Sequence, residues 1–441
     1  MLRLLGRVVD VKREELPALG WTWLYFYAVL ASYYVIRPIR DEAGVAGGVD
    51  NLPWLWTGTL IAVSLSNPAF AALVARLPRV KFVSWSYRFF ALNLIGFFFL
   101  LRWATAEQNI WLGRGFYVWT AVFNLFVPSV FWAFMTDIFT REQAKRLFGI
   151  ISAAGTLGAM TGSMVTATLA QLMPPIYLVF VSVALIELSV LAVRRLARLS
   201  ERVREVTGAS SNEQIIGGSV IAGIRNAVQS PYMLAISAHM LLFTILSTVL
   251  YFQQAAIVDR TFADRAARTV FFARVDLLTN SLAFVLQLFA FGQLVKIIGV
   301  TLTLAVVPVL SAAGFALLGV YPTVAVVVVF NAVRRATNFA LARPTREVLF
   351  IVLPREDRYK TKNFIDTFVY RLGDQIGAWS LAALGAAGFG LIGMAWISVP
   401  LSIVWLVNGL WLGRQQERLA TAPVAATVAE PAPNVFVGAR P

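Results

Sequence analysis

Arginines lie inside, or at the ends of, several long apolar stretches of this sequence. In the stretch 322–348, Asn331, Arg334 and Arg335 fall roughly 14–20 Å from its start if it is helical, which is near the middle of a bilayer. Asn338 shares a helical face with Asn331 and Arg334. Because a cation in hydrocarbon costs at least ~2.5–3.5 kcal/mol, we expect these side chains to line a water-filled path that binds anions.

A second group of charges ends the first apolar stretch, in the segment YYVIRPIRDEAG. Arg37 and Arg40 are three residues apart, so on a helix they share a face, and Asp41 lies beside them. Pro38 weakens the backbone hydrogen bonding of that helix locally. Two interpretations are open: the cluster binds a substrate, or it caps the helix at the membrane surface.

Carboxylates in or beside the apolar stretches are candidates for coupling or gating. Asp374 and Arg371 belong to a polar stripe in NFIDTFVYRLGDQIG, and Asp374 is a candidate partner for one of the two adjacent arginines near the bilayer middle. Asp276 is expected either to form a structural ion pair or to take part in proton coupling. Asp137, at the cytoplasmic mouth of its stretch, is expected to act in a gate or to form a salt bridge between helices, and Asp41 is expected to take part in coupling or gating.

The composition identifies lipid as the solvent. The chain has 441 residues, of which 59% are hydrophobic and only 14% are charged, more apolar surface than a soluble domain could bury. Its net charge of +15 follows from basic cytoplasmic loops, so no nucleic-acid partner is expected. There is no cysteine and one histidine, His239, which excludes disulfides and Cys- or His-rich metal sites and leaves no metal or cofactor expected.

Twelve apolar stretches are long enough to span a bilayer as helices. Basic residues collect in the even-numbered connections between spans. We therefore expect those loops and both termini on the cytoplasmic side of a bacterial inner membrane. The expected spans are 18–42, 53–75, 82–102, 111–138, 147–171, 175–193, 231–256, 271–294, 300–320, 322–348, 364–387 and 390–413.

The chain is predicted to consist of two six-helix bundles, residues 1–193 and 231–413. A basic cytoplasmic linker, 194–230, joins them, and its first part is expected to form a surface helix. Residues 414–441 are expected to be a disordered cytoplasmic tail, because the end of the chain is rich in Ala and Pro.

An internal repeat supports this division. The connections 73–83 and 292–304 have the same order of Leu, basic residue and turn, six spans apart, and each resembles the short basic loop of the major facilitator superfamily. The fifth span carries glycines four residues apart and so does the eleventh, which is the spacing that allows close helix packing in lipid. These glycines are Gly158 and Gly162, and Gly373 and Gly377. The predicted fold is therefore an all-α membrane protein of the major facilitator type.

Three segments also resemble the ATP/ADP translocase family: YYVIRPIRDE, FWAFMTDIFTREQAKRLFGIISAAGTLGAMTGS and YKTKNFIDTFVYRLGDQIG. The resemblance implies a major-facilitator-like fold that exchanges nucleotides without hydrolysing them. It places Arg40 at the basic position of the first helix, where that family typically has lysine. The sequence departs from the family pattern at Thr120, where the exchangers carry glutamate, and at Asp374, where they carry lysine.

We expect a monomeric secondary transporter that moves an organic anion by alternating access, such as a phosphorylated metabolite in ATP/ADP-type exchange. The substrate-binding residues would be Arg37, Arg40, Asn331, Arg334, Arg335, Asn338 and Arg371. The alternative is a flippase or exporter of an amphipathic lipid or cell-envelope precursor. No enzyme is expected, because the sequence lacks a phosphate-binding loop with Lys-Ser/Thr.

Overall fold

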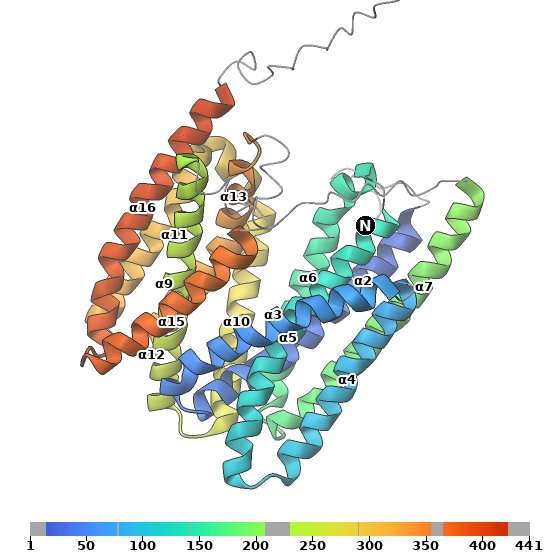
Figure 1. Cartoon of the computed structure of the whole chain (residues 1–441), viewed down its shortest axis with the longest axis horizontal. Coiled ribbons are helices and arrows are strands. Elements are labelled where there is room, and N and C mark those ends of the chain that lie inside the picture. The colour runs from blue at the N-terminus through green and yellow to red at the C-terminus, as the bar shows by residue number, and fades with distance from the viewer. Residues whose placement is uncertain are drawn as a thin grey trace, which may run out of the picture.

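A computed structural model describes residues 15–76, 79–139, 141–207, 230–289, 291–353 and 365–421 of the chain. Within these residues the chain is helical and contains no strand. Figure 1 shows the helices as two groups that lie beside each other. The N-terminal group consists of α2 (Leu16–Ala46), α3 (Leu52–Arg76), α4 (Arg79–Trp103), α5 (Ala106–Ile138), α6 (Arg141–Leu169) and α7 (Val179–Thr207).

The C-terminal group has the same up-and-down course. One of its long helices is interrupted by the π-helical segment η4 (Asn338–Ala342), just before Pro344, whose nitrogen carries no hydrogen for the helical ladder. Another begins with the π-helical segment η5 (Ile365–Val369). The helices are α9 (Pro231–Thr261), α10 (Arg265–Phe289), α11 (Phe291–Val320), α12 (Val324–Thr337), α13 (Arg343–Leu349), α15 (Tyr370–Ala386) and α16 (Leu391–Thr421).

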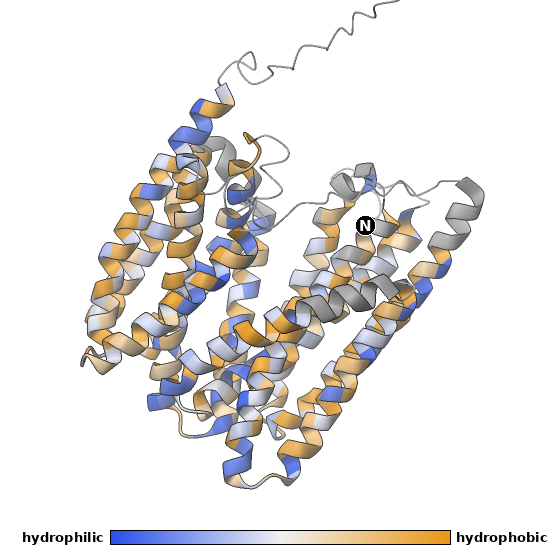
Figure 2. Ribbon diagram, viewed as in Figure 1, coloured by the Kyte–Doolittle hydropathy of each residue, from blue (hydrophilic) through white to orange (hydrophobic). Residues whose placement is uncertain are grey.

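The surface of these helices is apolar, as a lipid solvent requires. Large side chains such as Trp85, Leu65 and Leu92 are about two-thirds exposed on the outside, and Figure 2 shows hydrophobic residues along most of the helices of both groups. Ten segments of the described chain are long and apolar enough to cross a membrane. α3 and α15 lie at the two remaining spans expected from the sequence. The prediction of an all-α, multi-pass membrane protein is confirmed.

Two helices extend beyond the expected spans. α7 continues through the basic segment to Thr207 as one helix, where the sequence predicted a separate surface helix. α16 continues to Thr421, past residue 414, because RQQERLAT consists almost entirely of good helix formers. The remainder of the expected linker, 208–229, and of the expected tail, 422–441, lies outside the described residues.

Glycines bring equivalent helices together in the two groups. A Cβ on Gly158 or Gly162 of α6 would meet the backbone oxygens of Tyr27 and Ala31 of α2. In the C-terminal group, Gly377 of α15 packs on the backbone of α9 in the same way. The prediction that these glycines serve close helix packing is confirmed.

The two groups meet at one end, which we call the closed end. It carries the α4–α5 and α9–α10 connections, and in Figure 1 the groups converge there and diverge toward the end where the described chain begins. One apolar cluster joins both groups at this end: Leu52, Leu55 and Tyr117 pack with Leu250 and Phe252. The closed end is therefore held by hydrophobic packing as well as by the polar contacts described below.

Helices that start at the closed end are capped by side chains. The Thr105 hydroxyl accepts a hydrogen bond from the Gln108 N–H at the start of α5, and the Gln108 side-chain oxygen accepts one from the Thr105 N–H. Thr323 caps α12 and Asp264 caps α10, the latter by accepting from the Ala267 N–H at 2.8 Å. These caps fix where each helix begins, and therefore the height at which its charged residues lie.

The glycine contact gives a test of the packing. We expect Gly162→Ala to lower the thermal unfolding temperature in detergent, because the added Cβ would overlap the α2 backbone, and overpacking typically costs about 1–3 kcal/mol. Gly96→Ala in α4 is the matched control, since nothing lies within 4 Å of its added Cβ. An unfolding temperature for Gly162→Ala as high as that of the control would contradict the packing.

Candidate functional site

Five charged side chains meet where the two groups face each other, and we call them the seam cluster. They are Arg37, Arg40 and Asp41 of α2, Asp276 of α10 and Arg335 of α12. Counting from the closed end, Arg37 is nine residues from the end of α2, and Asp276 and Arg335 are each eleven from the start of their helices. At ~1.5 Å per residue, all three lie about 14–17 Å from that end.

Asp276 is the centre of this cluster. Its Oδ1 atom is 2.8 Å from Nη1 of Arg335, within the C-terminal group, and 3.2 Å from Nη1 of Arg37, in the N-terminal group. Arg37 also lies 3.8 Å from Asp41, one turn along α2. The carboxylate is therefore shared by two arginines, one from each group.

A second set of contacts crosses the seam beside the first. Arg40 donates to Asp41 Oδ1 at 2.7 Å, and its guanidinium lies over the Tyr117 ring, 3.7 Å from the ring centre. The Tyr251 hydroxyl of α9 donates to Asp41 at 3.1 Å and accepts from the Tyr117 hydroxyl at 3.2 Å. The phenols thus connect α5, α9 and α2 around the same charges.

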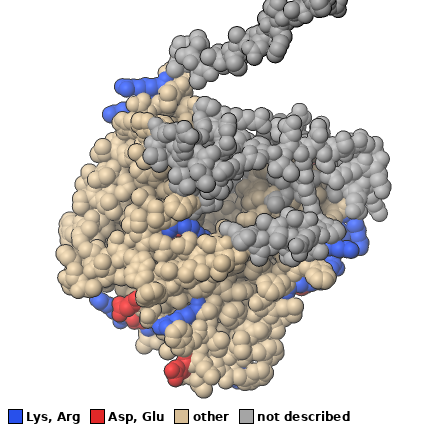
Figure 3. Space-filling view, viewed as in Figure 1, with Lys and Arg blue, Asp and Glu red and all other residues tan. Residues whose placement is uncertain are grey.

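The seam cluster carries an excess of positive charge. Three guanidiniums face two carboxylates, and the arginine side chains are 15–19% exposed while Asp41 and Asp276 are only 5% and 3% exposed. Among the described residues, Nε of Arg40 and Oδ2 of Asp276 have no hydrogen-bond partner although both atoms are buried. Figure 3 shows Lys and Arg atoms between the two groups, next to a hollow in this face. With all five groups ionised, three arginines against two aspartates give the cluster a net charge of +1.

Further contacts close the seam toward the closed end. Arg265 of α10 holds Glu42 of α2 with two parallel hydrogen bonds of 2.8 and 3.1 Å. Thr57 of α3 donates to Gln375 at 2.9 Å and accepts from Trp379 at 3.1 Å, both on α15. Within the described residues, every hydrogen bond and ion pair between the groups lies at the seam cluster or nearer the closed end.

Arg334 lies apart from the seam cluster, inside the C-terminal group. It is 2% exposed and donates to the hydroxyls of Ser311 and Ser247 at 2.9 and 3.1 Å, with the rings of Phe243 and Trp405 beside it. No carboxylate of the described chain pairs with it. In this conformation Arg334 is enclosed by neutral groups of α9, α11 and α16.

The other expected site residues lie elsewhere on α12 and α15. Asn331 donates to Gln254 of α9 in the core of the C-terminal group. Arg371 pairs with Asp374 at 3.4 Å on the same helix, so the expected contact between Asp374 and a central arginine is absent from the described structure, and Asp276 takes that role. Asn338 is half-buried at the start of η4. Asp137 belongs to α5, and its side chain lies outside the described side chains.

Several residues at the seam were missed by the sequence reasoning. Glu42 directly follows Asp41, so an acid at the end of the first span was a usable signal, but its partner Arg265 is 223 residues away. Tyr117 and Tyr251 carry no charge and resemble any other aromatic residue of a membrane helix. Within the described residues, no group of three His, Cys, Asp or Glu side chains could hold a metal ion.

Comparison with protein-family models and with curated proteins found no match to this chain. Among solved structures, a bacterial homologue of the iron transporter ferroportin, in an inward-facing state, is similar with a TM-score of 0.61 and 14% identity, over 91% of this chain and 98% of that one. A bacterial homologue of the human lysosomal transporter Spinster, inward-facing and unoccupied, is similar with a TM-score of 0.53 and 13% identity, over 93% and 98%.

A POT family transporter in complex with a thioalcohol-conjugated peptide is similar with a TM-score of 0.60 and 11% identity, over 91% of this chain and 96% of that one. At these identities the likeness concerns the fold, and the resemblance to ATP/ADP translocases stays a prediction. The chain has the all-α, major-facilitator-like fold of membrane transporters.

Removing the shared carboxylate tests the seam cluster. We expect Asp276→Asn to lower the unfolding temperature, because Arg37 and Arg335 would lose their common partner, and breaking a buried pair costs about 3 kcal/mol. Adding Arg335→Gln should recover part of the loss. A double variant that is no more stable than the single variant would show that Asp276 does not balance the two arginines.

Proposed function

We propose that this protein is a secondary transporter that moves a small organic anion across the membrane by alternating access. The observation that carries the proposal is the excess positive charge of the seam cluster, at the height where both groups contribute side chains. A substrate bound there contacts both groups at once, so it can influence how they move relative to each other. The likeness to transporters of three kinds supports a transport role for the fold.

The contacts across the seam suggest the conformational change. The groups are joined at the closed end, so the conformation described here would admit substrate from the opposite end, which the charge distribution of the loops assigns to the cytoplasm. To open the closed end, Arg37 must leave Asp276 and Glu42 must leave Arg265. Asp276 then keeps Arg335 as its partner, which limits the cost of separating the groups.

The chemistry of the cluster favours phosphate or carboxylate as the recognised group. A guanidinium offers parallel donors that match both anions, and the three arginine side chains of the cluster are 15–19% exposed. The ring of Tyr251, which is half-buried beside the charges, would contact a flat organic part of the substrate. Within this class we propose a nucleotide as the first substrate to test, on the resemblance of the chain to ATP/ADP translocases.

Uptake into proteoliposomes tests the proposal. We expect labelled ADP or another organic anion to enter vesicles preloaded with the unlabelled anion, and Arg335→Gln to reduce uptake by roughly tenfold or more, because one charge-assisted hydrogen bond is lost. Arg102→Gln is the matched control, since Arg102 is an exposed arginine at the far end of α4, outside the cluster.

The outcomes separate the class of substrate from its identity. If other phosphorylated or carboxylated compounds exchange but ADP does not, the proposal of a nucleotide substrate is wrong, and the proposal of an organic-anion transporter is supported. Full uptake by Arg335→Gln would contradict the role of the seam cluster. Transfer of a labelled lipid between leaflets, without uptake of any water-soluble anion, would favour the alternative of a flippase.

A further inference from the structure

A pocket lies outside the seam cluster, at the closed end between α6 and α10. Its volume is about 420 Å³, within the ~300–1,000 Å³ range of small-molecule sites. Gln171 follows the end of α6, Phe262 precedes α10, and Val270, Phe271 and Arg274 lie on α10 itself. The pocket is therefore built from both groups of helices, at the seam where they meet.

Arg274 is the cation of this pocket, and it faces away from the seam cluster. Its side chain is exposed and makes no hydrogen bond or ion pair with any described residue. Leu278 and Val285 follow it four and eleven residues later, on the same stripe of α10, and are 46% and 50% exposed. A stripe of exposed large apolar side chains in a membrane helix faces lipid, so Arg274 faces lipid too.

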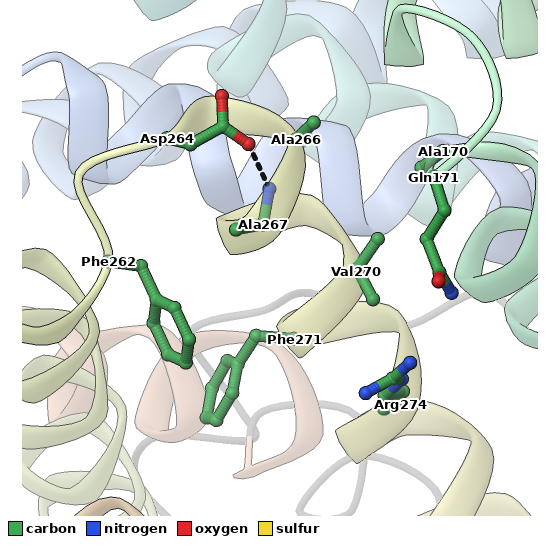
Figure 4. Close-up of a pocket in the computed structure, with 9 residues that line it drawn as sticks. All are labelled: Ala170, Gln171, Phe262, Asp264, Ala266, Ala267, Val270, Phe271 and Arg274. Atoms are coloured by element: carbon green, nitrogen blue, oxygen red, sulfur yellow. Dashed lines mark hydrogen bonds between the residues drawn. The ribbon is translucent and has the colours of Figure 1, made fainter.

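The position of Arg274 along α10 puts its guanidinium near the height of lipid headgroups. The residue is nine positions from the start of the helix, roughly 14 Å from the closed end. Side chains on a helix point back toward its N-terminus, which here is the closed end, and a long arginine can extend to the membrane surface. Figure 4 shows Arg274 at the opposite end of the pocket from Asp264, one turn beyond Val270 and Phe271.

From this placement we propose that the pocket binds an anionic phospholipid of the leaflet at the closed end. The lipid phosphate pairs with Arg274, and the headgroup lies in the pocket beside Gln171. The acyl chains extend along Leu278 and Val285 toward the middle of the membrane. This arrangement gives the unpaired cation a partner of opposite charge at the height of the lipid headgroups.

The lipid would also affect the seam. Val270, beside the pocket, packs into the apolar core of the N-terminal group although it belongs to α10. A molecule held between α6 and α10 contacts both groups, so it stabilises the conformation in which the closed end is closed. The site is independent of the anion that the seam cluster is proposed to bind.

Lipid retention by the purified protein tests this site. We expect the full chain in detergent to keep phosphatidylglycerol, counted by native mass spectrometry, and Arg274→Leu to need a roughly fivefold higher lipid concentration for the same occupancy. Arg274→Lys, which keeps the charge, should retain most of the binding. Arg102→Leu is the control, because it removes another exposed arginine at the closed end that does not line the pocket.

Three results would overturn the proposal. The first is equal retention of phosphatidylglycerol by Arg274→Leu and the unmodified chain, and the second is an equal loss in Arg102→Leu. The third is displacement of the lipid by inorganic phosphate alone, which would make the ligand a free anion. Unfolding temperatures in lipid-free detergent show whether Arg274→Leu is folded, and Arg274→Lys keeps the test valid if it is not.

Discussion

One carboxylate, shared by two arginines, connects the two halves of this molecule. Asp276 is 3% exposed and binds Arg335 within its own group and Arg37 across the seam. A buried carboxylate with two guanidiniums satisfies its own charge but leaves the cluster positive. In the function proposed above, that imbalance would suit the seam to an anion, and the shared carboxylate would link anion binding to the separation of the groups.

The surrounding fold determines where this carboxylate lies. Glycines let α6 pack directly on α2, which carries Arg37, Arg40 and Asp41, and let α15 pack on α9, which carries Tyr251. Side-chain caps fix the starts of α10 and α12 at the closed end, which places Asp276 and Arg335 at one height. The apolar contacts and the Glu42–Arg265 pair keep that end closed in the conformation described.

The sequence was sufficient to predict the membrane-spanning helices, but it was not sufficient to predict which charged residues pair with each other. Long apolar stretches and glycine spacing identify the helices and their close contacts, because lipid imposes both. Arginines deep within the apolar stretches were also recognisable, because a cation in hydrocarbon costs free energy and is therefore expected to have a function. The partner of Arg335 was not recognisable: Asp374 and Asp276 are both acids within predicted helices, and only the packing of α12 against α10 within the C-terminal group selects Asp276. The enclosure of Arg334 by two serines has the same origin.

The most direct test of alternating access is to cross-link the two groups of helices at the closed end. Trp54 of α3 and Trp379 of α15 have ring centres 4.8 Å apart across the seam, and the chain has no native cysteine. After Trp54→Cys and Trp379→Cys, a cleavable thiol cross-linker should reduce transport to background, and cleavage should restore it. The control pair is Phe98→Cys and Phe180→Cys, which lie together within the N-terminal group and should transport while cross-linked. Full transport with the closed end cross-linked would contradict alternating access about this seam.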